Sequence, residues 1–381
     1  PTRIIVPSID VVHNRVAIEI MRGCTRGCRF CHAGMVTRPV RERPVNEIIE
    51  AIQESLNHTG FEEIALLSLS SSDYTKISKL VEILMQNFSD QNLRISLPSL
   101  RIESFSIDLM EKLKGSKPGG FTLAPEAATN RMREIINKPV QTEQLLDTAR
   151  EIYKRGWLSI KLYFMIGHPD ETLDDVKAIA GLCKAVINEG RKIVGGRAKL
   201  NVGVSTFVPK PHTPFQWVPC DTLDKINVKQ KILQKELRVP GIKFKWTDPR
   251  ETLFEAMLSR GDRRLGKVIL DAWKKGAKFD AWQEKFNFKA WELSLQENGI
   301  DPEFYTHRER PTNEVFPWDH INTGVRKEFL VNDFMKSFEG ETRLDCRHNC
   351  FACGILSTFS EKRSQNPGSK WECPEIKVDP E

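Results

Sequence analysis

The chain has 381 residues, of which 40% are hydrophobic and 28% are charged. This composition is that of a globular protein of two or three domains, and it excludes wholesale disorder and fibrous repeats. Lys and Arg number 57 against 51 Asp and Glu, which gives a net charge of +6. Because the basic residues are dispersed, a nucleic-acid partner is permitted but not indicated. No uncharged apolar stretch approaches about 18 residues, so we expect no transmembrane helix and no membrane partner.

The first residues and the cysteines bear on the compartment. The chain begins Pro-Thr-Arg, with no Met and no apolar leader, so we expect no signal peptide and interpret the chain as a fragment or a processed product. Nine cysteines are an odd number, and six of them form two tight triplets. A secreted disulfide framework would scatter its cysteines, so this grouping favours a reducing, cytoplasmic location and ligation of a metal or cluster.

The first 219 residues alternate between strand and helix patterns. Apolar segments that end at Gly, Ser or Pro predict strands at Val16–Met21, Ile64–Leu69, Leu93–Leu97, Gly120–Ala124, Leu158–Ile166 and Lys199–Phe207. Helical spacing between them predicts helices at Pro44–Asn57, Ser78–Phe88, Ile107–Leu113, Thr142–Lys154 and Thr172–Asn188. Six successive strand–helix units predict an α/β fold with a parallel sheet and helices outside. Because a closed barrel needs eight units, we expect an open, partial (β/α)6 barrel.

The character of the chain changes after Pro219. Residues 220–342 are expected to be mainly helical, with helices at Asp221–Arg238, Arg250–Ser259, Arg263–Lys274, Ala281–Phe286 and Ala290–Asn298. Residues 343–381 form a cysteine-rich, loop-like tail that we expect to bind a metal or a cluster. The predicted organisation is therefore a core at 1–219, a helical region at 220–342 and a tail at 343–381.

The strongest motif is a cysteine triplet directly after the first predicted strand. Cys24, Cys28 and Cys31 have the spacing Cys-x3-Cys-x2-Cys, at the end of the sheet where parallel β/α barrels carry their active sites. Three thiolates satisfy three irons of a [4Fe–4S] cluster and leave the fourth iron open. The alternative is a zinc knuckle, but no second cysteine pair follows nearby, and the adjacency of His32 to Cys31 makes joint ligation strained.

This triplet, with Phe30 before its third cysteine, resembles the signature of the radical S-adenosylmethionine (SAM) superfamily. Two segments resemble its methylthiotransferase-like branch, Phe164–Thr172, where His168 and Asp170 replace the commoner Leu and Gly, and Val204–Phe215. More narrowly, the chain resembles bacterial members that carry an N-terminal cobalamin-binding-like domain, through Val12–His13, Arg38–Arg43, Ser68–Asp73, Arg260–Arg264, Pro317–Asp319 and Asp345–Cys346. That domain is absent from this chain, so cobalamin is expected only through a missing upstream domain.

The resemblance implies a radical SAM barrel and a definite chemistry. Cys24, Cys28 and Cys31 would hold the cluster, and its open iron would chelate the amino and carboxylate groups of SAM. Phe30 would lie against the adenine. An electron donor such as flavodoxin or ferredoxin would reduce the cluster. The resulting 5′-deoxyadenosyl radical would serve hydrogen abstraction or group transfer on an unknown substrate.

Two further strand ends carry candidate SAM contacts. Glu126 follows the fourth strand, and the resemblance implies that it accepts hydrogen bonds from the ribose hydroxyls; the alternative is a solvent-facing loop residue. Ser70 and Ser71 end the second strand, where many members have Gly-Gly-Glu to receive the SAM amino group. Serine hydroxyls, Asp73 or backbone carbonyls would substitute here.

Two basic side chains near the fifth strand are also candidates. Lys161 lies in an apolar strand, where an unpaired buried lysine is unfavourable. A lysine facing the barrel interior would pair with the SAM carboxylate, and the alternative is a structural ion pair. His168 at the end of that strand would contact substrate or relay a proton, or it is simply a hydrogen-bonded loop histidine.

A second triplet repeats the first spacing near the carboxyl end. Cys346, Cys350 and Cys353 are followed by Cys373, a fourth potential thiolate. Four thiolates make a closed site, which suits a second [4Fe–4S] cluster or a structural zinc ion. Cys183 and Cys220 stand alone and are expected to be core or surface thiols.

The leading interpretation is a radical SAM enzyme whose catalytic residues and substrate the sequence does not reveal. The alternative is a non-catalytic iron–sulfur or zinc protein that binds RNA or a protein partner. No β-rich RNA-binding module is visible at the carboxyl end, which lowers the expectation of tRNA modification. Release of 5′-deoxyadenosine from SAM distinguishes the two interpretations.

Overall fold

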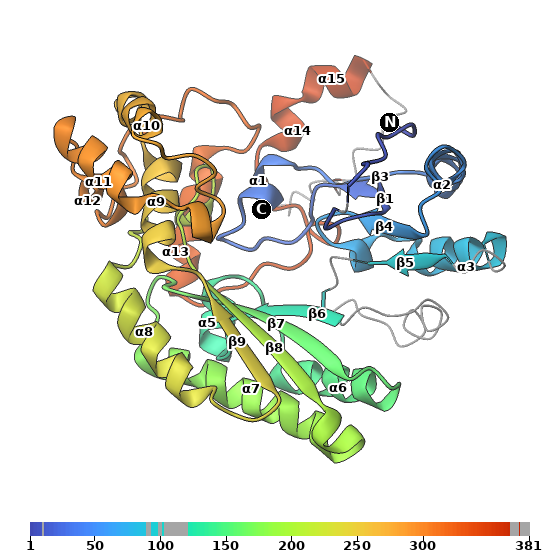
Figure 1. Ribbon diagram of the computed structural model, residues 1–381. Helices are drawn as coiled ribbons and strands as arrows, with labels where there is room; N and C mark the ends of the chain where they lie inside the picture. Colours follow the sequence, from blue (N-terminus) through green and yellow to red (C-terminus); the bar gives the residue numbers. More distant parts are fainter. Residues whose placement is uncertain (10, 89–92, 98–100, 103–120, 366–372, 374–381) are drawn as a thin grey trace, which may run out of the picture.

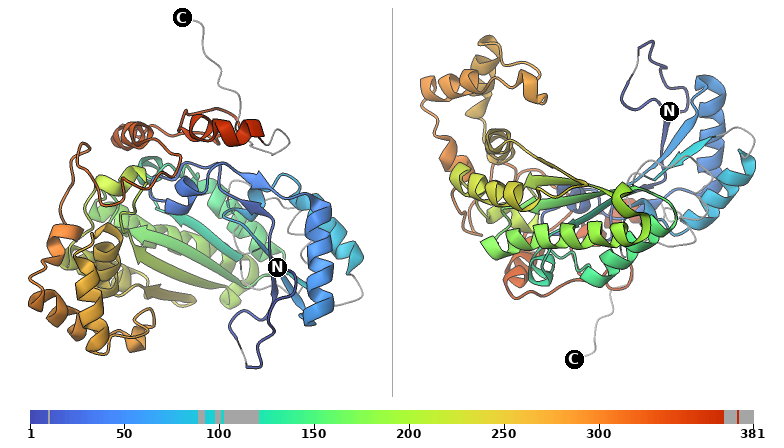
Figure 2. Two further views of the ribbon diagram at one scale, coloured as in Figure 1. Left: turned by 90° about the horizontal axis from the view of Figure 1, so that it is seen from above. Right: turned by 60° about the horizontal axis from the view of Figure 1, so that its bottom comes forward.

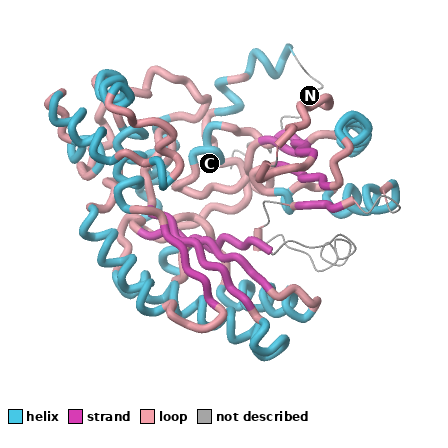
Figure 3. Tube along the Cα trace, in the orientation of Figure 1, coloured by secondary structure: helices cyan, strands magenta, loops and turns pink. Residues whose placement is uncertain are grey.

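The computed structural model describes residues 1–9, 11–88, 93–97, 101–102, 121–365 and 373. Parallel strands form the inner layer and helices the outer one (Figures 1 and 3). The strands are β1 (Val16–Glu19), β4 (Glu63–Leu67), β5 (Arg94–Ser96), β6 (Phe121–Glu126), β7 (Ser159–Ile166), β8 (Lys199–Thr206) and β9 (Ile242–Trp246). Two parallel sheets result, in the orders β1-β4-β5 and β6-β7-β8-β9. A short antiparallel pair, β2 (Met21–Arg22) and β3 (Arg41–Glu42), follows β1.

Helices cover the outer face of both sheets. The first sheet packs against α2 (Val45–Thr59) and α3 (Ile77–Asn87), and the second against α6 (Thr142–Lys154), α7 (Leu173–Val194) and α8 (Leu223–Glu236) (Figure 1). Apolar residues at alternate positions of β7, Ile160, Leu162, Phe164 and Ile166, are buried under these helices. The residues between them face the concave side, because successive side chains of a strand point to opposite faces.

A smaller helical region and the tail complete the molecule. The helical region contains α9 (Pro249–Arg260), α10 (Leu265–Lys274), α11 (Phe288–Glu297) and α12 (Pro302–Thr306), which share a core of their own. In the right-hand view of Figure 2, this helical region and the first sheet lie at opposite ends of the second sheet and both extend to the same side of it. No helix in the described ranges is long and apolar enough to cross a membrane.

The chain then returns to the carboxyl ends of the strands through α13 (Lys327–Phe338), α14 (Ile355–Thr358) and α15 (Ser360–Gln365). Residues of α13 and the tail share a core with α1 (His32–Val36), with α5 (Asn130–Ile135) and with the turn η4 (Pro214–Trp217). The carboxyl-terminal segment is therefore packed against the end of the barrel that carries the first cysteine triplet.

The predicted α/β fold and partial barrel are confirmed, and all six expected strands form in the expected order. The prediction of a mainly helical region after residue 219 missed β9, which pairs in parallel with β8. Ile242–Trp246 alternates apolar and charged residues, so the sequence carried a strand pattern there that the prediction of a helical region overlooked. The three-part division at 219 and 342 remains a prediction.

Three smaller expectations differ from the structure. Pro125 does not end β6, because a bulge lets the strand continue to Glu126. Only a short 3-10 turn, η5 (Gln283–Lys285), forms where a helix at Ala281–Phe286 was expected. The tail is not wholly loop-like, since it contains α14 and α15. The helix expected at Ile107–Leu113 lies outside the described residues.

Candidate active site

The first cysteine triplet lies in the loop between β2 and α1, which is held from both sides. Gly23 has φ +86°, and a Cβ there would lie 2.6 Å from the carbonyl oxygen of Pro39, so only glycine fits. The fully buried guanidinium of Arg29 donates to the carbonyl oxygens of Glu134 and Ile135, at 2.9 Å each. These contacts fix the loop to α5.

One cavity of about 360 Å³ opens beside this loop, at the carboxyl ends of the strands. It gathers most of the predicted first-site residues: all three cysteines, Phe30 and Glu126 line it. The full lining is Cys24, Arg26, Cys28, Phe30, Cys31, Gly34, Leu69, Arg101, Thr122, Ala124, Glu126, Lys138 and Tyr163. Residues from the two sheets and from the cysteine loop therefore converge on one space.

The three thiols are partly shielded from water and surrounded by donors. Gly34 N–H donates to Cys31 Sγ at 3.3 Å, and Arg101 Nη1 donates to Cys28 Sγ at 3.9 Å. Burial raises the pKa of Cys24, and that of Cys31 to about 11, with the neighbouring Cys28 as the second cause. The free thiols of Cys24 and Cys31 are therefore protonated at neutral pH, and a bound metal is what would stabilise their thiolates.

The donor set fits an iron–sulfur cluster better than a single metal ion. Among the described residues, no three His, Cys, Asp or Glu side chains are close enough together to hold one ion. A [4Fe–4S] cluster needs a wider arrangement, because each thiolate binds a different iron. The cavity provides three thiols, and Arg101 and Lys138 act against the rise in thiol pKa at Cys24 and Cys31, respectively.

Glu126 reaches the cavity through an unusual backbone conformation. It has φ 65°, in the left-handed region, and the bulge in β6 brings it into register with Phe164 of β7. Its Oε1 accepts a hydrogen bond of 3.0 Å from Lys138 Nζ, and both side chains are largely buried. The solvent-facing alternative for Glu126 is not what the geometry shows.

Ser70 and Ser71 are not brought to the cavity. Ser70 Oγ donates to Asp73 at 2.7 Å, and Ser71 Oγ donates to the carbonyl oxygen of Leu66 at 2.9 Å. Asp73 is itself bound by Arg26, whose Nη2 donates to it at 2.7 Å. The hydroxyls thus stabilise the turn after β4, and Leu69 is the residue of this segment that lines the cavity.

Lys161 and His168 take different positions from each other. Lys161 is exposed on the concave side of β7, two positions before Tyr163 in the same strand. It is not part of the cavity lining. His168 is buried between the rings of Phe30 and Phe207, with centroids 5.8 and 5.3 Å away. Neither ring nitrogen has a hydrogen-bond partner among the described residues. Burial, and then the charge of Lys229, lowers the pKa of His168 to about 3.

The second cysteine group lies against the first loop. Cys346 N–H donates to the carbonyl oxygen of Thr25 at 3.0 Å. Burial raises the pKa of Cys346 to about 12 and that of Cys373 to about 11, and nearby thiols, including Cys353, add to both shifts. The four cysteines are thus neighbours, although they do not converge on a single ion. The isolated Cys183 and Cys220 are both buried in the core.

A charged network joins the two cysteine loops. Asp345 accepts from Thr25 Oγ1 and Arg347 Nη2, each at 2.8 Å, and lies 3.4 Å from Arg26 Nε. Arg347 Nη1 also donates to the carbonyl oxygen of Asp73 at 2.9 Å. Burial would raise the pKa of Asp345, but the hydrogen bonds from Arg347 and Thr25 lower it to about 2.

Eight of the thirteen lining residues were not predicted from the sequence, and Arg101, Lys138 and Tyr163 are three of them. Arg101 follows the third strand by a few residues, so its place near a strand end was a usable signal. Tyr163 occupies a concave position of β7, which the alternation of that strand also indicated. No pattern marks Lys138, because it reaches the cavity from the loop after α5.

Comparisons with known proteins identify a superfamily over part of the chain. The model of the radical SAM superfamily matches residues 18–183. An uncharacterized protein of Methanocaldococcus jannaschii is 33% identical over 252 residues, which are 66% of this chain and 53% of that protein. A tRNA-2-methylthio-N(6)-dimethylallyladenosine synthase of Desulforamulus reducens is 28% identical over 177 residues, 44% of this chain and 39% of that enzyme. The chain spans about half or less of the length of these curated relatives.

Among solved structures, a radical SAM methyltransferase, TsrM, from Kitasatospora setae, with cobalamin and a [4Fe–4S] cluster bound, has a TM-score of 0.45 and 16% identity. The match covers 53% of this chain and 38% of that chain. The range matched by the superfamily model begins within β1 and includes the cysteine triplet and the strands β4 to β7. Residues 18–183 match the radical SAM superfamily, and this similarity implies a [4Fe–4S] cluster and SAM as cofactors.

Proposed function

We propose that the chain is an enzyme that cleaves SAM reductively and uses the radical for hydrogen abstraction or group transfer. The observation that supports this most is that Cys24, Cys28, Cys31, Phe30 and Glu126 line one cavity at the carboxyl ends of the strands. Cys24, Cys28 and Cys31 would hold a [4Fe–4S] cluster, which would supply the one electron needed to cleave the sulfonium of SAM into methionine and a 5′-deoxyadenosyl radical. A donor such as flavodoxin or ferredoxin would provide that electron.

The other cavity residues bind and orient SAM in this proposal. Phe30 packs against the adenine, and Glu126 accepts from the ribose hydroxyls with Oε2, since Oε1 is already bound to Lys138. Lys138 lines the cavity and is proposed to face the SAM carboxylate, whereas Lys161 is not part of the lining. The hydroxyls of Ser70 and Ser71 are engaged elsewhere, so a backbone carbonyl near Leu69 receives the amino group.

Anaerobic reconstitution tests the proposal. The reconstituted chain, given dithionite and SAM, is expected to release 5′-deoxyadenosine and methionine, whereas Cys28→Ala should release neither. Cys220→Ala is the matched control, because its thiol is buried and is not part of the cavity lining, so its loss should not affect cleavage. Intact SAM after reduction, with the cluster demonstrably present, would instead favour a non-catalytic iron–sulfur protein that binds RNA or a protein partner.

The second cysteine group is proposed to hold a separate metal centre. Cys346, Cys350, Cys353 and Cys373 offer four thiolates, which leave no open position for SAM on a [4Fe–4S] cluster or a zinc ion. The hydrogen bond from Cys346 N–H to Thr25 supports a role in holding the first cysteine loop in place. Metal analysis of the purified chain separates iron from zinc at this group.

A further inference from the structure

Three exposed lysines share the concave face of the second sheet with the cavity. The strand register aligns two rows across this face: Thr122, Lys161, Asn201 and Lys243, then Tyr163, Gly203 and Lys245. Thr122 and Tyr163, at the near ends of the rows, line the cavity. Because residues in register on neighbouring parallel strands point to the same face, the lysines extend the cavity surface toward β9.

These lysines have no charged partner within the parts of the chain that the structure describes. Lys161, Lys243 and Lys245 make no ion pair and no side-chain hydrogen bond there. Other lysines near the barrel are neutralised: Lys138 pairs with Glu126, and Lys229 is bound by two carboxylates. A group of like charges with no counter-charge makes a positive potential that attracts an anionic ligand.

The three lysines are spread over the backbone of the three strands β7 to β9. Lys243 and Lys245 are two residues apart on one strand, roughly 6.6 Å, and Lys161 is two strands from Lys243, about 10 Å. Several negative charges on one ligand, as in linked or successive phosphates, fit this spacing. Lysine is a suitable phosphate contact because it acts as a compact point charge.

Tyr163 gives this face a flat apolar element between the cavity and Lys245. A Cβ on Gly203 would lie 2.7 Å from the Tyr163 ring, so the ring covers Gly203 and needs a glycine there. The ring remains 43% exposed. An exposed aromatic ring beside unpaired lysines suits a ligand that combines a planar base with phosphate groups.

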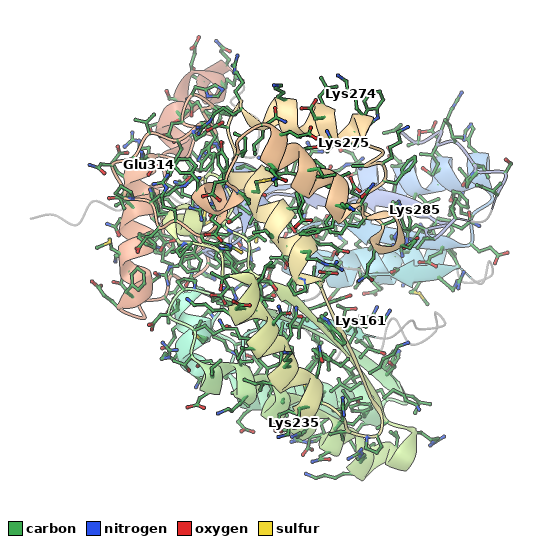
Figure 4. The ribbon with its side chains drawn as sticks, turned by 60° about the vertical axis from the view of Figure 1, so that its left-hand side comes forward. Lys161, Lys235, Lys274, Lys275, Lys285 and Glu314 are labelled. Atoms are coloured by element: carbon green, nitrogen blue, oxygen red, sulfur yellow. The ribbon has the colours of Figure 1, made fainter. Side chains whose placement is uncertain are left out.

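Protection of the sheet edge against pairing with other chains explains only some of these three lysines. β9 is the last strand of its sheet, and lysines on edge strands prevent pairing with other chains. This accounts for Lys243 and Lys245 but not for Lys161, because β7 has a neighbouring strand on each side. Figure 4 shows Lys161 on the sheet, well away from the outer helix α8 that carries Lys235.

We propose that Lys161, Lys243 and Lys245 bind phosphate groups of the substrate. This rests on the proposed function, because it assumes that the substrate reaches SAM across this face. Both a nucleoside polyphosphate and the backbone of a single-stranded nucleic acid carry the required chemistry. The two sources are distinguished by using one probe of each kind.

The test measures binding of inorganic tripolyphosphate and of a single-stranded RNA oligonucleotide over a range of salt concentrations. Each of Lys161→Gln, Lys243→Gln and Lys245→Gln should weaken binding several-fold, and the triple variant should abolish it. For the oligonucleotide, each lysine that contacts a phosphate should contribute about 0.7 to the logarithmic salt dependence. Lys235→Gln is the matched control, since it removes the same charge from α8.

Each outcome has a definite meaning. Lysine-dependent binding of tripolyphosphate alone supports a small phosphate ester, and lysine-dependent binding of the oligonucleotide supports a nucleic-acid substrate. Equal binding by the triple variant and the unaltered chain, or no binding of either probe, overturns the proposal. These measurements need neither SAM nor reductant, so a failure to release 5′-deoxyadenosine would count against the proposed function and not against this surface.

Discussion

The hydroxyl of Thr25 donates a buried hydrogen bond of 2.8 Å to Asp345, 320 positions further along the chain. Thr25 lies between two of the first three cysteines in sequence, and Asp345 directly precedes the second cysteine group. Arg26 and Arg347 both form ion pairs with the carboxylate of Asp345. This one buried anion therefore connects the two cysteine loops. The tail therefore stabilises the loop that supplies the thiols of the cavity.

The first prediction concerns Asp345. Asp345→Asn keeps the shape of the side chain but removes the charge that Arg26 and Arg347 share, leaving two partly buried cations without their common partner. We expect a loss of about 2 kcal/mol in the free energy of unfolding, less than for a fully buried pair because both arginines are partly exposed. Denaturant unfolding measures it.

The control for this variant is Glu297→Gln, which breaks an exposed ion pair with Lys275. Such a pair contributes little, so we expect a change below about 0.5 kcal/mol. Because Asp345 connects the two cysteine loops, we also expect Asp345→Asn to retain less iron at Cys24, Cys28 and Cys31 than the unaltered chain after anaerobic desalting. Equal stability and equal iron retention in the two variants would contradict the coupling.

The second prediction concerns metal stoichiometry. If both cysteine groups hold [4Fe–4S] clusters, Cys24→Ala and Cys346→Ala should each lose roughly four irons per chain, and losses should add in the double variant. If the second group holds zinc, Cys346→Ala should lose about one zinc ion and no iron. Cys183→Ala is the control. Cys183 lies on α7 with its thiol buried in the core, so this variant should leave the metal content unchanged.

Much of the scaffold was predictable because it depends on short-range patterns. Alternating burial in β7 and β8 follows directly from the alternation of apolar residues, and the cysteine spacing identified the loop at the strand ends. β9 was overlooked although Ile242–Trp246 alternates apolar and charged residues, which is a strand pattern, and in the structure Lys243 and Lys245 occupy the concave positions of that strand.

The candidate site was predictable only where the motif itself supplied the residue. Glu126 reaches the cavity because β6 has a bulge beyond Pro125, and no local signal shows which partner it will meet. The partner, Lys138, comes from a different loop. The hydroxyl groups of Ser70 and Ser71 suggested that these residues contact SAM. In the folded chain, however, both hydroxyls donate hydrogen bonds to nearby acceptors. Tertiary contacts of this kind have no periodicity to detect.

The third prediction concerns the Glu126–Lys138 pair. Glu126→Gln removes the charge that would accept from two ribose hydroxyls, and Lys138→Gln removes the cation proposed to face the SAM carboxylate. We expect each to weaken SAM binding about tenfold, equivalent to about 1.4 kcal/mol, as measured by titration calorimetry on cluster-loaded chain. Glu134→Gln on the exposed side of α5 is the control. Affinities of the cavity variants equal to that of the control would remove these residues from the SAM site.

The last prediction concerns pH and His168. In the folded chain the pKa of His168 is lowered to about 3, by burial and then by Lys229, whereas an unfolded histidine titrates near 6.5. Between these values the unfolded chain binds the additional proton, so stability is full above about pH 6.5 and falls as the pH decreases. From this residue alone we expect a loss of about 1 kcal/mol in the free energy of unfolding between about pH 7 and pH 5.5.

His168→Leu places an apolar side chain of similar reach between Phe30 and Phe207 and removes the titrating group. The variant should therefore lose that part of the pH dependence while remaining as stable as the unaltered chain, or more so, below about pH 6. His320→Gln, at an exposed position, should keep the full dependence. If His168→Leu and the unaltered chain lose the same stability on acidification, the ring is protonated in the folded state and lies in a more polar environment than its two aromatic neighbours provide.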